Sequence, residues 1–241
     1  MNIYSIIDFI GGHNPKYSVD NLSLYGVLGP DDDGYYDNNG KQGGWVMRYS
    51  DSSDIHLKRY FKDDVQNGKN IGYYSDGKIQ SVTRYVNGKL DGEYVSYYHN
   101  GKVRVEGHHK NNERDGKWIT YLDNGAIMDT QEYKNGNYNG EFVEYFKSGK
   151  IGSRGFYKDD SKHGMWERFN EDGELIRKGT YVDDYKEGMW EETNIEENGV
   201  KTVSQGEYKR SVKVGVWTRM DMDGRLLSKM NYDKLKNIYR W

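Results

Sequence analysis

The sequence predicts an all-β fold: an elongated single-layer sheet of tandem β-hairpin repeats, with a short helix at the C-terminal end. Three observations predict this fold. A glycine recurs at a step of 24 residues, a second glycine follows a small polar residue within most intervals, and aromatic residues occupy the segments between them. The 30 Gly against 2 Pro also favour a chain that turns often through conformations that suit glycine.

The glycine period defines the repeat units, of which the chain has about eight. Each unit should contain two strands joined by a tight turn. The period loosens after the seventh glycine, because the unit that begins at Gly188 carries three extra residues and the next unit begins at Gly215. The periodic glycines are Gly44, Gly68, Gly92, Gly116, Gly140, Gly164 and Gly188.

The second glycine of each unit predicts a hairpin turn. A type I′ turn needs positive φ at both central positions, and Asn-Gly and Asp-Gly are the pairs that favour it most. We therefore expect type I′ turns inside the units and a polar loop, such as Lys134-Asn135-Gly136, between them. The turn pairs are Asp76-Gly77, Asn100-Gly101, Asn124-Gly125, Ser148-Gly149 and Asp172-Gly173.

The strand that follows each periodic glycine carries aromatic residues on both faces. Successive side chains of a strand point to opposite faces, so positions two apart share a face. We expect one row to pack as the core and the other to bind a partner, with core packing alone as the alternative for either row. One face receives Trp118, Phe142, Trp166 and Trp190, and the other receives Tyr97, Tyr121, Tyr145 and Phe169.

Aspartate pairs recur at the loops between units, at Asp159-Asp160 and Asp183-Asp184. Stacked units would align these pairs along one rim, where their charge would support docking of a basic partner surface. Aspartate is also a common turn residue, so an ordinary solvated edge is the alternative.

The sequence predicts a non-enzymatic protein without a cofactor. The loop 31–40 gathers carboxylates but lacks the spacing of a calcium-binding EF-hand, so a cation site and a plain surface loop both stay open. His108 and His109 should point to opposite faces of a strand and therefore cannot share one metal ion. A small hydrolase is the remaining alternative, although no G-x-S-x-G motif occurs.

Charge and composition exclude several partners. The 35 Lys+Arg residues balance 38 Asp+Glu for a net charge of −3, so the chain lacks the basic field that sequence-independent binding of nucleic acid requires. The chain has no Cys, which excludes disulfides and a cysteine nucleophile. The apolar start lacks preceding basic residues, and no stretch reaches the roughly 18 to 20 apolar residues of a membrane span. We therefore predict a soluble, cytoplasmic protein that does not bind nucleic acid and does not span a membrane.

The chain should have three segments: an N-terminal cap over 1–40, hairpin repeats over 41–232 and a C-terminal cap over 233–241. Apolar residues of the last segment have helical spacing, which predicts a short helix. Such a helix would cover the last edge strand. An imperfect cap would let copies of the chain form homo-oligomers through their sheet edges.

The recurring order of Asp-Gly-Lys-Trp-x-x-Tyr, Asn-Gly and Tyr-Lys-Asn-Gly resembles the MORN repeat family over residues 40 to 232, in particular its bacterial variant class described as antitoxin-like. The clearest matches begin at Asp91-Gly92 and His163-Gly164. Asn70 departs from the pattern where an aromatic residue is expected, and His109 replaces the usual Tyr. The resemblance implies a sheet of stacked hairpins that serves as a scaffold or protein-binding surface, and it implies no shared catalytic residues.

We therefore predict an interaction scaffold that binds, and inhibits, a protein partner through one aromatic face. The partner of such an antitoxin- or inhibitor-like protein would be a toxin or another effector. A membrane-surface or lipid scaffold is the alternative, and it would need a basic face beside exposed aromatic residues.

Overall fold

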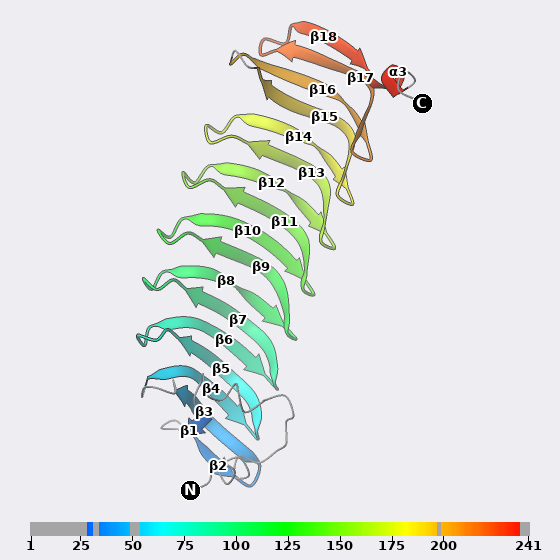
Figure 1. Ribbon diagram of the computed structural model, residues 1–241. Helices are drawn as coiled ribbons and strands as arrows, with labels where there is room; N and C mark the ends of the chain where they lie inside the picture. Colours follow the sequence, from blue (N-terminus) through cyan, green and yellow to red (C-terminus); the bar gives the residue numbers. More distant parts are fainter. Residues whose placement is uncertain (1–27, 31–33, 49–53, 197–198, 237–241) are drawn as a thin grey trace. The chain divides into compact units, whose positions relative to one another are not determined.

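The computed structural model describes residues 28–30, 34–48, 54–196 and 199–236, and nearly all of them lie in antiparallel strands (Figure 1). The chain forms two compact units, unit 1 over Met1–Gly88 and unit 2 over Lys89–Trp241. The predicted all-β fold of tandem hairpins is confirmed.

Unit 1 is an antiparallel sheet built around β3. The strands β1 and β2 pair with different stretches of β3, and β4, β5 and β6 follow, each pairing with the strand before it. The strands of unit 1 are β1 (Leu28–Pro30), β2 (Tyr35–Asp37), β3 (Gly40–Arg48), β4 (Ile55–Lys62), β5 (Val65–Tyr73) and β6 (Ile79–Val86).

Unit 2 is a ladder in which every strand pairs with the next one along the chain, from β7 to β18 (Figure 1). Its elements are β7 (Lys89–Tyr97), β8 (Val103–Lys110), β9 (Glu113–Tyr121), β10 (Ile127–Lys134), β11 (Asn137–Tyr145), β12 (Ile151–Lys158), β13 (Ser161–Phe169), β14 (Leu175–Val182), β15 (Tyr185–Ile195), β16 (Lys201–Lys209), β17 (Val212–Asp221), β18 (Leu226–Asn231) and the helix α3 (Tyr232–Lys236).

The tightest turns lie between the repeat units, where the sequence pattern predicted only a polar loop. Asn135 (φ 51°) and Gly136 (φ 83°) both have positive φ, as a type I′ turn requires. The predicted type I′ turn at pairs such as Asn124-Gly125 is wrong, because only Gly125 has a positive φ there (94°). This turn is a type I turn followed by glycine, and Asn124 stabilises it by accepting a hydrogen bond from the Ala126 N–H (2.9 Å).

The periodic glycines are bulge residues inside strands. Gly140 has a φ of 132°, which L side chains rarely adopt, and the pairing register between β10 and β11 shifts near it. The 24-residue step therefore marks a bulge in the first strand of each repeat. In the first repeat of unit 1 the equivalent residue is Gly43 (φ 71°) and not Gly44. The predicted register of this repeat is therefore wrong by one residue.

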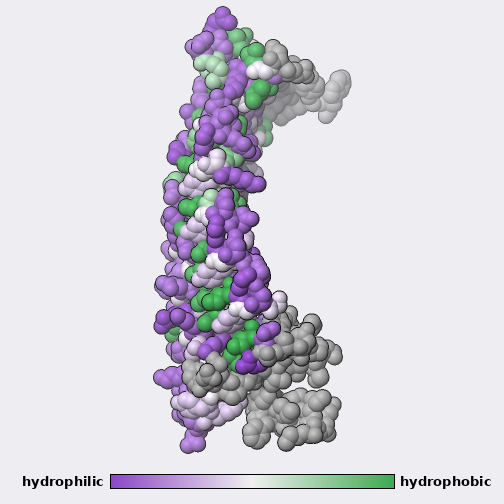
Figure 2. Space-filling model, turned by 90° about the vertical axis from the view of Figure 1, so that its left-hand side faces the viewer, coloured by the Kyte–Doolittle hydropathy of each residue, from purple (hydrophilic) through white to green (hydrophobic). Residues whose placement is uncertain are grey.

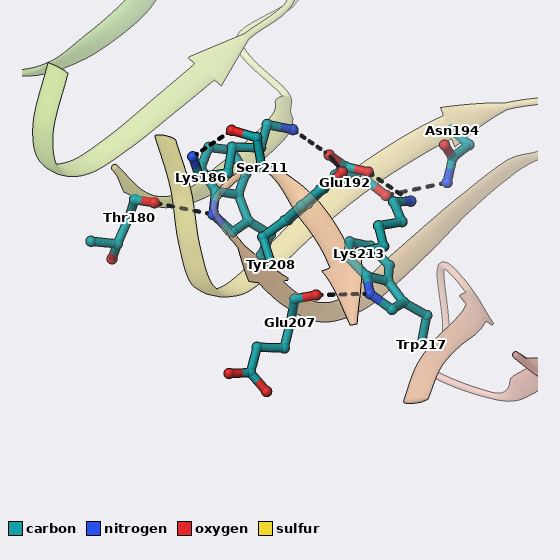
Figure 3. Close-up of polar contacts among 10 residues, drawn as sticks. Thr180, Lys186, Glu192, Asn194, Glu207, Tyr208, Ser211, Lys213 and Trp217 are labelled. Carbon is teal, nitrogen blue, oxygen red and sulfur yellow. Dashed lines mark hydrogen bonds and ion pairs between the residues drawn. The ribbon is translucent and has the colours of Figure 1, made fainter. Parts of the chain in front are cut away.

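The tryptophans of unit 2 lie across glycines of the preceding strands. A Cβ atom added to Gly179 would lie 2.2 Å from the Trp190 ring, and one added to Gly206 would lie 2.3 Å from the Trp217 ring. Only glycine leaves room for the indole at these positions. Each indole also donates a hydrogen bond to a backbone carbonyl: Trp118 to His108, Trp166 to Phe156, Trp190 to Thr180 and Trp217 to Glu207. Figure 3 shows the bond from Trp217 to Glu207.

Ring contacts continue from one repeat to the next and form the core of unit 2. The Tyr181 ring meets Trp166 edge-on at 6.2 Å and Trp190 at 5.0 Å, so each tyrosine of this kind links two tryptophans. We call this side of the sheet the Trp face and the opposite side the Tyr face. The buried hydrophobic side chains of unit 2 are Trp118, Tyr133, Val143, Trp166, Trp190, Tyr208 and Trp217.

The two departures from the repeat pattern fit into the sheet. In unit 1, the Asn70 Nδ2 donates a hydrogen bond to the Thr83 Oγ1 (3.2 Å), so two polar residues replace the usual ring and glycine. In unit 2, the His109 ring packs edge-on against Trp118 at a centroid distance of 5.0 Å, as a tyrosine does elsewhere. Neither substitution interrupts the strand pairing.

The described parts of the two predicted caps belong to the sheet or pack against it. Strands β1 and β2 lie within the predicted N-terminal segment, whose residues 1–27 are outside the described residues. The helix α3 contacts β17 through the Tyr232 ring, 6.2 Å from Trp217, and through Asp233, which accepts a hydrogen bond from the Gly215 N–H (3.1 Å). Residues 237–241 also lie outside the described part. Among the described residues, no helix has the length and hydropathy needed to cross a bilayer.

We expect Gly206→Ala to lower the free energy of unfolding by about 1–3 kcal/mol, because the added methyl group would overlap the Trp217 indole. Urea unfolding followed by tryptophan fluorescence measures the loss. Glu207→Ala is the matched control, since its exposed side chain lies on the opposite face and should change the free energy by less than about 0.5 kcal/mol. Equal unfolding midpoints for the two variants would contradict the packing argument.

Candidate interaction surfaces

The Trp face carries a row of cationic side chains on top of its buried indoles. The Lys162 Nζ lies 4.4 Å from the Trp166 ring centroid, the Lys186 Nζ 4.3 Å from Trp190 and the Lys213 Nζ 3.7 Å from Trp217. A cation above an indole is attracted by the negative face of the ring. The predicted binding residues Trp118, Trp166 and Trp190 are therefore packed beneath other side chains and are 4%, 6% and 2% exposed.

In the last repeats two of these cations, Lys186 and Lys213, share one carboxylate. Glu192 accepts from Lys186 (2.7 Å) and Tyr208 (3.0 Å), and its other oxygen lies 3.3 Å from the Lys213 Nζ (Figure 3). Burial raises the pKa of Glu192, but the hydrogen bond and charge of Lys186, with the charge of Lys213, outweigh burial and lower it. Burial raises the pKa of Tyr208, and the charge of Glu192 and its hydrogen bond with Tyr208 raise it further.

A pocket of about 240 Å³ lies on the Trp face between β11 and β15. Its floor consists of the rings of Trp166, Tyr181 and Trp190. Three cationic residues, Lys162, Arg168 and Arg177, and the residues Glu144, Ser153 and Glu167 complete the lining.

The Tyr face carries the predicted row Tyr97, Tyr121, Tyr145 and Phe169, all half-buried. The Tyr121 hydroxyl donates to the Glu106 Oε1 (2.6 Å), and the Arg154 guanidinium lies 5.7 Å from the Phe169 ring centroid. Beside this row, ion pairs join neighbouring strands at Arg154–Glu167 (2.5 Å) and Lys178–Glu191 (3.5 Å).

The Tyr face also bears exposed apolar residues that the sequence analysis missed. Met165, Met189 and Val216 each follow a periodic glycine and are 52%, 67% and 52% exposed. At the same position, the earlier repeats of unit 2 have charged residues, among them Lys117 and Glu141. Phe156, 52% exposed, lies on the same face, and we call the four residues Phe156, Met165, Met189 and Val216 the apolar stripe. The side of the chain that Figure 2 presents is mostly hydrophilic, with hydrophobic residues in separate small groups.

The predicted aspartate rim consists of type I′ turns with structural roles. Asp159 and Asp160 have φ of 47° and 68°, and Asp183 and Asp184 have φ of 48° and 67°. The Asp160 Oδ1 accepts from the Tyr138 N–H (2.7 Å) and the Asp184 Oδ1 from the Lys162 N–H (2.8 Å). The Asp159 Oδ1 accepts from the Asn139 side-chain amide (3.0 Å). These contacts tie each turn to the neighbouring repeat, and docking of a basic partner at the rim stays a prediction.

The described residues contain no group of three or more His, Asp and Glu side chains that could hold a metal ion. His109 lies on the Trp face against Trp118, and strand alternation places His108 on the opposite face. Asp31, Asp32 and Asp33 of the acidic loop lie outside the described residues.

Together these features define a tandem β-hairpin repeat protein with a ring-packed core. Four segments, residues 66–87, 90–111, 114–135 and 162–183, match the family model described as MORN repeat variant. Repeats of this kind are in general modules for interaction with proteins or membranes. The predicted resemblance to MORN repeats is confirmed, whereas the match carries no support for the antitoxin-like class.

No curated protein matches the chain. Among solved structures, 38 chains match. One of them is a crystal structure of a protein of unknown function from Bacteroides caccae, with 11% sequence identity and a TM-score of 0.17. That match covers 86% of this chain and 73% of the other.

The hydrogen bond from Tyr121 to Glu106 raises the pKa of Tyr121 to about 12, with burial and the charge of Glu106 adding to the shift. We expect Glu106→Gln to lower this pKa toward the ordinary value of about 10, because a neutral amide no longer favours the protonated phenol. Titration of ¹³C-labelled tyrosine by NMR measures the change, and Tyr121→Phe assigns the signal. An unchanged pKa in Glu106→Gln would show that the contact is not formed in solution.

We expect Asp184→Ala to destabilise the protein by about 1–3 kcal/mol, since alanine is strained at positive φ and cannot accept the hydrogen bond from the Lys162 N–H. Asp184→Gly should cost less, because glycine adopts the turn without strain, as Gly136 does at the equivalent place. Thermal unfolding followed by circular dichroism compares the two variants. Equal losses in the two variants would show that backbone strain at this position does not contribute to the loss.

Proposed function

We propose that the chain is a non-catalytic scaffold that binds a protein partner through the Tyr face of unit 2. The apolar stripe is the observation that carries this proposal. Side chains such as Met189, 67% exposed, leave apolar surface in water without a structural reason, because the ring-packed core of unit 2 lies on the other face. Burying one such side chain in an interface would stabilise a complex by about 1.5–3 kcal/mol.

The surroundings of the stripe suit a protein interface. Methionine and aromatic residues are enriched in such interfaces, and the half-buried row of Tyr121, Tyr145 and Phe169 extends the stripe along the same face. The ion pairs Arg154–Glu167 and Lys178–Glu191 would form a polar rim that sets orientation. A neutral rim of this kind favours a protein over an anionic membrane surface, which attracts clustered basic residues.

A more specific form of this proposal is that the scaffold inhibits the partner that it binds. A partner held against a sheet face would lose access to its own substrate or target, so the scaffold would act by occlusion without chemistry. A toxin or another effector is the partner class that this mode would serve, and an assay of the partner's activity at increasing scaffold concentration tests it.

The binding face is tested by placing charges on the stripe. In Met165→Lys/Met189→Glu, two apolar residues become the residue types found at the same repeat position at Lys117 and Glu141, so the fold should tolerate them. Affinity purification from the native host with quantitative mass spectrometry identifies the partner, and calorimetry with the purified partner gives the affinity. We expect a loss of at least about tenfold.

The comparison is the double exchange Lys117→Glu/Glu141→Lys, which alters charge at the same repeat position without removing apolar surface and should weaken binding less than the stripe variant does. The variant Tyr121→Ala/Tyr145→Ala, shown by circular dichroism to stay folded, tests whether the aromatic row contributes. If a stoichiometric partner binds the wild type and all three variants equally, the Tyr face is not the binding surface.

A further inference from the structure

The pocket on the Trp face departs from its neighbouring repeats in its charges. In the repeat that contains Gly188, Lys186 precedes the glycine by two residues and Glu192 follows it by four, and the two side chains form an ion pair (2.7 Å). One repeat earlier the same two positions hold Lys162 and Arg168, which are both cationic. The same two positions therefore hold opposite charges in the repeat of Gly188 and like charges in the repeat of Gly164.

A third cation lies beside this pair on the neighbouring strand, on the same face of the sheet. Arg177 on β14 is the register partner of Arg168 on β13, so the two guanidinium groups start from directly opposite positions on the same face. The strand on the other side offers only Ser153 opposite Arg168. In the part of the chain that the structure describes, the side chains of Lys162, Arg168 and Arg177 form no ion pair or hydrogen bond.

Among the described residues, the carboxylates around the pocket form no ion pair with this cluster. Glu167 is paired with Arg154 on the Tyr face (2.5 Å), and Glu192 is held by Lys186 and Lys213. Glu144 accepts a hydrogen bond from the Ser153 hydroxyl (2.9 Å). The charges of Asp184 and Glu144 act on Lys162 without an ion pair. Burial, followed by the charge of Arg177, lowers the pKa of Lys162, while the charges of Asp184 and Glu144 act in the opposite direction.

We propose that this pocket binds the carboxylate side chains of an acidic polypeptide segment, with Arg168 and Arg177 as the guanidinium donors and Lys162 as the third cation. Arginine forks match the geometry of a carboxylate, and an anion would relieve the repulsion among the three cations. The pocket lies on the face opposite to the apolar stripe, so it is a second binding site and does not depend on the Tyr-face interaction.

Two features favour a carboxylate over a phosphate. Glu144 on the pocket wall repels an anion in proportion to its charge, so a dianion is disfavoured relative to a single carboxylate. The lining residues belong to paired strands, whereas phosphate cradles usually use the free N–H groups of a helix N-terminus or of a nest in a turn. The open, aromatic floor suits a chain that lies across the sheet.

Fluorescence anisotropy with a fluorescein-labelled deca-glutamate peptide tests the site on the full chain at low ionic strength. Arg168→Glu places a carboxylate where Glu192 lies in the next repeat, and Arg177→Ser introduces the residue that occupies the equivalent positions Ser153 and Ser204, so both should fold. We expect each substitution to weaken binding at least about tenfold and added salt to weaken binding by the wild type.

Lys134→Glu is the matched control, because it makes the same reversal of charge at an exposed residue outside the pocket and should leave the affinity within about twofold. Three results would overturn the proposal: no binding by the wild type, equal binding by wild type and Arg168→Glu, or an equal loss in Lys134→Glu. Displacement of the peptide by inorganic phosphate at a lower concentration than by acetate would instead identify a phosphate site. A protein partner that still binds Arg168→Glu would leave the Tyr-face function intact.

Discussion

The packing of a tryptophan across a glycine is the constraint on which the structure of unit 2 depends. In the part of the chain that the structure describes, no second layer covers the sheet, so its core must be built from side chains on its own surface. The indole of Trp190 solves this by lying over the backbone of the preceding strand at Gly179 and donating its N–H to the Thr180 carbonyl (3.2 Å). Tyrosines then fill the spaces between successive indoles, so each repeat is stabilised mainly by its neighbours.

The repeat length and the two aromatic rows could be predicted from sequence, because the period of the sheet is the period of the chain. The turn types could not, since Asn-Gly is favoured both in a type I′ turn and after a type I turn. The number of residues between paired strands decides between them, and this depends on a register that bulges shift at residues such as Gly140. The position of the first bulge could not be predicted either, because the adjacent residues Gly43 and Gly44 are both glycines that could form it.

The candidate surfaces could be predicted only in part from the sequence. The aromatic rows indicated two faces, but alternation alone did not say which row is buried. The glycines beneath the indoles decide that question, and they escaped the period search because Gln131 interrupts the series that Gly107 and Gly155 would otherwise continue. The pocket was missed for a different reason. Its residues come from adjacent repeats, and Arg168 and Arg177 meet only when strand register is known.

The ring-packed core also explains why cationic side chains lie on the Trp face. An indole floor attracts cations, so lysine or arginine at the position two residues before the periodic glycine stabilises Trp118, Trp166, Trp190 and Trp217 alike. Once those cations are in place, the residue four positions after the glycine decides the net charge of each repeat. Glu192 makes one repeat internally neutral, and Arg168 leaves the preceding repeat with excess positive charge. One substitution within a fixed scaffold therefore separates a repeat that serves stability from a repeat equipped to recognise an anion.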